Sequence, residues 1–175
     1  MNRKNIFAIS GSTRKNSTNH HLINIIKELT KDIFNVSIYE NLASLPHFNP
    51  DNDNEMAGEE VMMFRKSIKD SDGVMICTPE YAHGVVGSLK NAIDWTVSSN
   101  EFYEKPTMLI TASTDGKSAH LALSETLRTI GAMHPDKISL LISFAKTKIA
   151  ADKIIDEQTE KEIRQLIINF EKILH

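Results

Sequence analysis

Cysteine is almost absent from this chain of 175 residues, in which Cys77 is the only one. A lone cysteine excludes an internal disulfide, a zinc site built from cysteines and a CxxC redox pair. Cys77 also lies inside an apolar run, residues 74–77. We therefore expect a protein of the reducing cytoplasm.

Long apolar runs and long basic runs are missing as well. The apolar run behind the short basic N-terminus is about four residues long, which is too short for the core of a signal peptide, and no stretch approaches the ~20 residues of a membrane span. The 20 lysines and arginines stand against 23 aspartates and glutamates, a net charge of -3. This balance lacks the basic patch typical of nucleic-acid binding. We expect a soluble, unprocessed protein with neither a nucleic acid nor a membrane as partner.

Short apolar runs alternate with longer segments of helical period, which predicts βα repeats and a mostly parallel sheet. The length suits one domain over residues 1–175. Runs 36–39 and 138–142 are the most polar, so they are expected near the sheet edges. The expected strands are residues 6–9, 36–39, 74–77, 108–110 and 138–142.

Helices are predicted where apolar residues recur at i, i+3, i+4 and i+7. Residues 22–33 and 163–174 follow this spacing, and helical patterns also cover 59–69, 87–97 and 117–130. Gly131 would close the last of these as a C-cap. The fold class is therefore α/β, a doubly wound five-stranded parallel sheet with helices on both faces.

The first loop, residues 10–19, combines hydroxyl side chains and Arg14 with a helix expected to start near Asn19. Hydroxyl donors, free amides and the positive helix end together favour a dianion. The loop is neither GxGxxG nor a P-loop, so a single phosphomonoester fits better than a pyrophosphate. The alternative is a helix cap, which would account for Ser17 or Thr18 alone. The expected phosphate donors are Ser12, Arg14, Ser17 and the amides of Thr18 and Asn19.

A second polar turn follows strand 74–77, and the loop at residues 113–117 follows the next strand. Carboxyl ends of parallel strands converge on one crevice, and Gly11, Gly84, Gly87 and Gly116 lie at that edge. Backbone groups of residues 79–84 would bind the edge of a flat heterocycle, with Tyr81 packing on its face. Taken singly, Tyr81 and His83 are ordinary exposed loop residues and Glu80 is a solvated charge.

The connection over residues 40–58 is long, polar and rich in Asn, Asp and Pro. Loops of this length are usually functional, so we expect a solvated lid, a subunit contact or part of an acceptor pocket. Asp51, Asp53 and Glu55 are spaced like calcium ligands, but the glycine and distal glutamate of an EF-hand are not in place. No metal site is predicted.

Two motifs resemble those of the NADPH-dependent FMN reductase family, a flavodoxin-like group that includes chromate reductases, quinone reductases and azoreductases. GSTRKNSTNHHL at residues 11–22 is similar to GSxRxxSxNxxL, and PEYAHGVVGSLKNAIDW at 79–95 to PEYNxxxPGxLKNAIDW. The resemblance implies strand order 2-1-3-4-5, FMN, and homodimers or homotetramers with the flavin near a subunit interface. The residues expected to hold the cofactor are Ser12, Arg14, Ser17, Thr18, Asn19, Pro79, Glu80, Tyr81, Ala82, His83, Ser113 and Gly116.

The resemblance implies that hydride passes from NADPH or NADH through FMN to a small acceptor such as a quinone, a flavin, an azo compound or a metal oxyanion. The flavin carries this chemistry, so no catalytic side chain is assigned. A flavodoxin-like electron carrier without efficient NAD(P)H turnover is the alternative. A phosphatase-like site is excluded, because it needs a cysteine in the first loop.

The chain departs from the family pattern at Ala82, where the family has Asn, at Val86, where it has Pro, and at Asp115. We expect the loss of the amide at Ala82 to remove a hydrogen bond near the flavin. Asp115 would disfavour the anionic reduced flavin. Asn91 and Trp95 match the motif and are expected in helix packing or a subunit contact.

Overall fold

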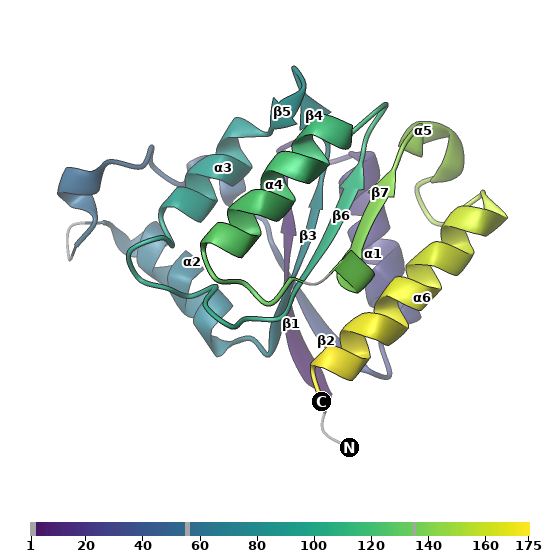
Figure 1. The fold of residues 1–175 in the computed structure, drawn as a ribbon, viewed down its shortest axis with the longest axis horizontal. Coiled ribbons are helices and arrows are strands. Elements are labelled where there is room, and N and C mark those ends of the chain that lie inside the picture. Colours follow the sequence, from purple (N-terminus) through teal and green to yellow (C-terminus); the bar gives the residue numbers. More distant parts are fainter. Residues whose placement is uncertain (1–2, 55–56, 135) are drawn as a thin grey trace.

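The computed structural model describes residues 3–54, 57–134 and 136–175, which form a five-stranded parallel sheet between two layers of helices (Figure 1). The order β2-β1-β3-β6-β7 confirms the predicted doubly wound sheet, since these strands taken alone read 2-1-3-4-5. The edge positions of β2 and β7 were also expected from their polarity. The strands are β1 Lys4–Ser10, β2 Phe34–Tyr39, β3 Gly73–Thr78, β6 Thr107–Ala112 and β7 Ser139–Ile142.

All five predicted helices are present, and short elements lie between them. The helices are α1 Thr18–Leu29, α2 Glu59–Asp70, α3 Gly87–Asp94, α4 Lys117–Thr129, α5 Ala145–Lys148 and α6 Glu157–Ile173. The shorter elements are the 3-10 turns η1 Leu42–Ser44, η2 Pro50–Asn52 and η3 Asp136–Ile138, and the hairpin strands β4 Glu80–Tyr81 and β5 Gly84–Val85. Sequence patterns missed α5 and the hairpin, because neither is long enough to show a period.

Side chains that alternate along the strands build two cores. Ala8, Met75 and Cys77 face one side of the sheet, where they pack against α1 and α6. Phe7, Ile76 and their neighbours face the other side, which α2, α3 and α4 cover. The central strands are therefore apolar on both faces, as parallel strands buried between helices must be.

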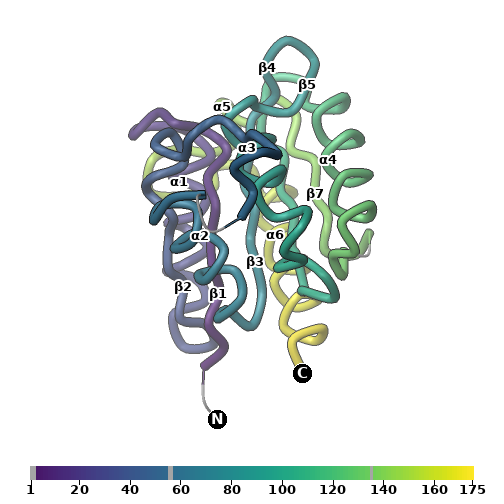
Figure 2. Tube along the Cα trace, turned by 90° about the vertical axis from the view of Figure 1, so that its left-hand side faces the viewer, coloured from purple at the N-terminus to yellow at the C-terminus, as the bar shows by residue number. Residues whose placement is uncertain are grey.

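The carboxyl ends of the strands lie at one end of the molecule. Figure 2 shows the β4–β5 hairpin and α5 at this end, opposite the start of β1 and the end of α6. Because the strands are parallel, the loops that follow β1, β3, β6 and β7 all emerge here. This edge carries the candidate site.

The segment at residues 40–58, expected as a solvated lid, a subunit contact or part of an acceptor pocket, is attached to α3 by hydrogen bonds. Asn91 on α3 accepts a hydrogen bond from the Phe48 amide (2.7 Å) and donates one to the Pro46 carbonyl (3.0 Å). The Trp95 indole donates to the same carbonyl (2.8 Å) and packs edge-on against the Phe48 ring. The motif residues Asn91 and Trp95 thus hold this segment against α3, which agrees with the packing role expected of them.

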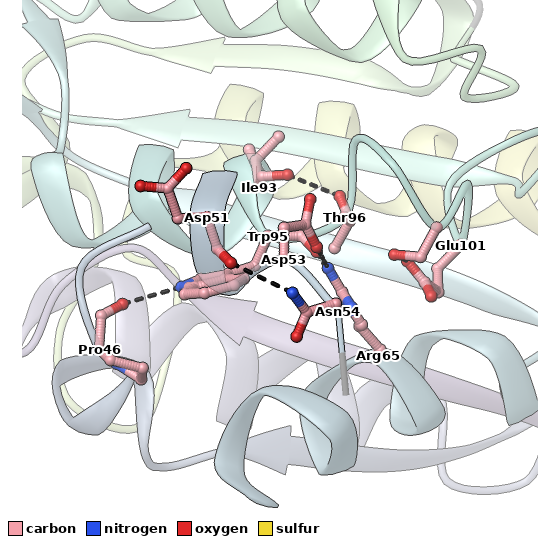
Figure 3. A network of polar contacts seen from close by, with 10 residues as sticks. Pro46, Asp51, Asp53, Asn54, Arg65, Ile93, Trp95, Thr96 and Glu101 are labelled. Carbon is pink, nitrogen blue, oxygen red and sulfur yellow. Dashed lines mark hydrogen bonds and ion pairs between the residues drawn. The ribbon is translucent and has the colours of Figure 1, made fainter. Parts of the chain in front are cut away.

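A buried ion pair fastens the same segment to α2 (Figure 3). Arg65 pairs with Asp53 at 2.5 Å and donates to the Trp95 carbonyl at 2.6 Å. Both charged side chains are only 10% exposed. Asp53 is therefore committed to an arginine, and Glu55 lies outside the described residues. No group of acidic, histidine or cysteine side chains in the described part of the chain could hold a metal ion.

Candidate functional site

A cavity of about 210 Å³ lies where the loops after β1, β3 and β6 meet α5. We call it the crevice. It brings together all the predicted cofactor residues except Ala82, His83 and Gly116. Its lining consists of Ser12, Arg14, Asn16, Ser17, Thr18, Asn19, Pro79, Glu80, Tyr81, Ala112, Ser113, Thr114, Ala145 and Lys146.

The start of α1 forms one wall. Ser17 is its N-cap, and the Ser17 hydroxyl accepts from the His20 amide at 3.1 Å. The Ser12 hydroxyl accepts from the Arg14 amide at 3.3 Å. Each hydroxyl still has its own proton to donate, and the first amides of a helix have no partner within it. The cap and the anion site are therefore compatible, because they use different atoms.

Two exposed cations border the crevice from different elements. Arg14 lies in the loop after β1, and Lys146 lies in α5 after β7. Neither has an ion pair with any residue that the structure describes. Sequence analysis missed Lys146, since the only available signal was a pair of lysines in the stretch that follows the last strand.

Hydrogen bonds between two loops hold α5 at the crevice. The Ala145 amide donates to the Ser113 carbonyl at 2.9 Å, and the Phe144 amide donates to the Thr114 carbonyl at 3.0 Å. The Ser143 hydroxyl donates to the carbonyl of Asp115 at 2.7 Å. Asp115 itself is exposed and does not line the crevice.

The Asn19 side chain points into the protein. Its Nδ2 donates to the Ala112 carbonyl at 3.0 Å, and its Oδ1 accepts from the Cys77 thiol at 3.2 Å. Burial raises the pKa of Cys77 far above its ordinary value, so the thiol keeps its proton. Both polar atoms of the Asn19 side chain thus have a partner within the protein, one at the end of β6 and one in β3.

Glu80 is not a solvated charge; that alternative is wrong. Its carboxylate accepts from the Ala119 amide at 2.9 Å and from the Gly116 amide at 3.3 Å, and its side chain is 7% exposed. The hydrogen bond from Ala119 lowers the pKa of Glu80, which outweighs the opposite effect of burial. Glu80 caps the N-terminus of α4, and its own amide donates to the Ser113 hydroxyl at 3.2 Å.

The three predicted residues that do not line the crevice all have positive φ angles. Ala82 and His83 have φ angles of 48° and 54°, the pair of positive values typical of a type I′ hairpin turn. Gly116 has φ of 90°, and a Cβ there would come within 2.8 Å of the Leu141 side chain. Tyr81, on the hairpin, lines the crevice and is 50% exposed.

Two other hollows differ from the crevice. One, of about 640 Å³, lies beside β1 and β2 and contains none of the predicted site residues. A smaller one of about 110 Å³ adjoins the crevice and shares Ser12 and Arg14 with it. The large hollow lies away from the carboxyl ends of the strands, where open α/β sheets bind ligands. The crevice is therefore the candidate ligand site.

Comparisons with known proteins agree on one family. A family model described as NADPH-dependent FMN reductase matches residues 4–147. The chain is 30% identical to NADH-dependent flavin reductase subunit 2 of Lactobacillus johnsonii, over 97% of this chain and 96% of that protein. It is 29% identical to an NAD(P)H:quinone oxidoreductase of Solanum tuberosum, over 93% and 89%.

A solved structure supports the same relationship. The flavoenzyme NAD(P)H:(acceptor) oxidoreductase FerB of Paracoccus denitrificans superposes with a TM-score of 0.80 at 27% identity, covering 98% of this chain and 97% of its own. The resemblance found in the two sequence motifs is thereby confirmed. No helix within the described ranges is long and apolar enough to cross a membrane.

Proposed function

Because this chain belongs to the NADPH-dependent FMN reductase family, and is thus an FMN-dependent NAD(P)H oxidoreductase, we propose that the crevice is where it holds FMN. One observation carries the proposal. A single cavity is bordered by hydroxyl groups, by the first amides of α1 and by two cations, Arg14 and Lys146, which form no ion pair with any described residue. A dianionic phosphate is the ligand that satisfies such a set of donors.

The residues present fit FMN. A volume of about 210 Å³ is smaller than the ~300 Å³ or more of pockets that enclose a whole drug-sized ligand. It suits the phosphate and the sugar chain, with the flat ring at the open mouth. Ser12, Arg14, Ser17, the first amides of α1 and Lys146 would hold the phosphate. Pro79, Tyr81 and Ser113 would border the ring.

When bound, the flavin supplies the hydride transfer, and the protein orients it. The chain's own residues have three tasks. The cations neutralise the phosphate, the hairpin presents Tyr81 beside the ring site, and Glu80 fixes the hairpin to α4. We assign no side chain to proton transfer, since none is required.

We propose that the acceptor is a small planar molecule or a metal oxyanion that enters beside Tyr81, whose exposed ring leaves the mouth open. The relatives named above act on a flavin or a quinone, which supports this class. They are all reductases or oxidoreductases, so they lend no support to the electron-carrier alternative. We also propose a homodimer or homotetramer and a cytoplasmic location.

The phosphate site is tested by the double variant Arg14→Ala/Ser17→Ala. We expect FMN affinity to fall on the order of 100-fold, since a charge-assisted and a neutral hydrogen bond are lost together. Lys146→Ala alone should weaken binding several-fold, and by less at high salt. The measurement is flavin fluorescence titration of apoprotein, with Arg164→Ala on the exposed face of α6 as control. A double variant that retains stoichiometric yellow flavin would refute the site.

The enzyme and the carrier are separated by anaerobic addition of NADPH or NADH to the flavin-loaded protein. Bleaching of the visible flavin band at catalytic rates supports the enzyme. A loaded protein that stays yellow would instead support the carrier.

A further inference from the structure

We propose that Asn19, held by the Cys77 thiol, is a positioning residue that gives the crevice its preference for FMN over riboflavin, which lacks the phosphate. The inference rests on the proposed function, because it concerns the same phosphate site. It assigns to Asn19 and Cys77 a role that differs from direct contact with the ligand.

Hydrogen bonds fix the orientation of the Asn19 side-chain amide, and the residue is only 3% exposed. The Ala112 carbonyl can only accept a hydrogen bond, so the NH₂ group of Asn19 must face it. The amide oxygen then faces Cys77, which is fully buried. A neutral thiol can donate to that oxygen, whereas a thiolate could not. Both polar atoms of the amide thus have a partner inside the protein.

The two hydrogen bonds of the Asn19 side chain hold the start of α1 in place. Asn19 is the second residue of α1, directly after Thr18 and the Ser17 cap. Its partners are the second-last residue of β3, Cys77, and the last residue of β6, Ala112, and both strands are buried along their whole length. The start of α1, with its unpaired amides, is therefore fixed to the centre of the sheet.

The loop after β1, which forms the other side of the phosphate site, is also attached at Cys77. The Gly11 amide donates to the Cys77 carbonyl at 2.8 Å, which ties the loop after β1 to β3. A Cβ on Gly11 would approach the Thr78 hydroxyl to 2.2 Å, so the loop and the strand are in close contact. Cys77 therefore holds both elements. Its carbonyl binds the loop after β1, and its thiol binds Asn19 at the start of α1.

Loss of these attachments should weaken binding of the phosphate and not of the ring. Amides bind an anion well only when several point at it together, so a small rotation of the α1 start weakens phosphate binding and leaves the ring site unchanged. Cys77 does not line the crevice. Any effect of its side chain on phosphate binding is therefore indirect, and the hydrogen bond to Asn19 is its polar link to the start of α1.

The test compares the dissociation constants of FMN and riboflavin by fluorescence titration of apoprotein. We expect Asn19→Leu to lower the FMN preference about tenfold and to leave riboflavin binding within about twofold, the size of effect that lost hydrogen bonds allow. Cys77→Ala should lower the preference about threefold, and Cys77→Ser, which restores a donor, should recover it. Thr30→Val is the matched control, because Thr30 is fully buried at the other end of α1 and its hydroxyl donates to the Ile26 carbonyl at 2.8 Å.

The ³¹P chemical shift of bound FMN gives a second readout. It should move in Cys77→Ala and stay at the wild-type value in Thr30→Val, even if both variants are less stable. If Asn19→Leu does not fold, the two Cys77 variants decide the question.

Two outcomes would overturn the inference. One is an unchanged preference in Asn19→Leu. The other is a large loss in Asn19→Leu with no change of affinity or ³¹P shift in Cys77→Ala, which would make Asn19 a direct ligand. A wild-type protein that binds neither flavin would instead remove the proposed function, and this inference with it.

Discussion

Ala82 shows how a departure from a family motif can concern the backbone and not the ligand. The motif has Asn at this position, and its loss was expected to remove a hydrogen bond near the flavin. In the structure Ala82 lies outside the crevice, in a turn with φ of 48°. Asn is favoured at such left-handed positions, where other side chains are strained. The motif residue is therefore explained by the turn.

Ala82→Asn should stabilise the protein by about 0.5–1 kcal/mol, because Asn tolerates the left-handed conformation that strains Ala. Urea unfolding measures the gain, and FMN affinity should stay within about twofold of wild type. Ala122→Asn serves as control. Ala122 is exposed within α4, where Asn is a poorer helix former than Ala and should destabilise. A loss of stability in Ala82→Asn would contradict the turn assignment.

Val86 departs from the motif without changing the local geometry. Its φ of -58° is close to the angle at which proline is fixed. Valine therefore keeps the chain direction into α3 that the proline of the motif would impose. This departure has no visible consequence for the crevice.

The sequence predicted which residues come together at the crevice better than it predicted what each side chain contacts. Ser17 was expected either as cap or as phosphate donor, and its hydroxyl can serve both. Asn19 and Glu80 both lie at the crevice, yet their polar atoms bind the strand ends and α4. The partners in these hydrogen bonds lie between 36 and 93 residues away along the chain, so no local sequence pattern predicts them.

At the scale of elements, the N-terminus of α4 depends on a carboxylate from the hairpin. Gly116, in a left-handed conformation, precedes the helix and has no side chain with which to cap it. Glu80 supplies the missing acceptor from a different part of the chain, and its negative charge also suits the positive end of the helix. The hairpin, α4 and the β6 loop therefore form one unit beside the crevice.

Glu80→Gln should cost about 1–2 kcal/mol at pH 7, since a charge-assisted bond becomes a neutral one. The folded pKa of Glu80 lies below the ordinary 4.5, so the unfolded chain takes up the proton first as the pH falls. The charge contribution is fully present above about pH 4.5 and is lost as the pH drops through the folded pKa. Urea unfolding should therefore show the gap between wild type and variant closing below pH 4.5.

The control for this prediction is Glu125→Gln, at an exposed position of the same helix with a side chain 75% exposed. It should change stability little at any pH, because exposed charges contribute little. An equal effect in the two variants would mean that Glu80 acts through the net charge of the protein and not through the cap.

A pair of histidines between α4 and the sheet predicts a second pH effect. His120 contacts the hydroxyls of Thr111 and Ser139, and His134 contacts the Thr107 carbonyl. Burial is the main cause that lowers the pKa of both rings below the ordinary 6.5. The charges of His134 on His120 and of Arg128 on His134 act in the same direction, while the Thr107 carbonyl and Asp136 oppose it.

Because the folded pKa values lie below 6.5, the unfolded state binds these protons first, and stability should fall as the pH drops below that value. The slope is at most about 1.4 kcal/mol per pH unit for each proton. The double variant His120→Gln/His134→Gln should flatten the fall in unfolding free energy between pH 7 and 5. His175→Gln, at the exposed C-terminus, should not. Equal slopes in all three proteins would contradict the role of the buried pair.

For the whole molecule, the sequence predicts the layers of sheet and helices but not every contact between distant segments. Nearly continuous apolar runs such as residues 6–9 were enough to predict strands covered on both faces. The strand order came from the family resemblance and not from the strands themselves. The position of residues 40–58 could not be predicted, because it depends on Arg65, Asn91 and Trp95, which belong to elements distant in the chain.

We expect the attachment of residues 40–58 to contribute to the stability of the fold and not to FMN binding. Asp53→Asn would leave the Arg65 charge buried without its carboxylate, which typically costs about 3–5 kcal/mol. None of the described residues of this segment lines the crevice, so FMN affinity measured well below the unfolding transition should stay at the wild-type value. Asp51→Asn is the matched control, since Asp51 is exposed and two residues away. If Asp53→Asn instead weakens FMN binding while the protein remains folded, this segment closes over the cofactor in solution, and the original expectation of a lid is correct.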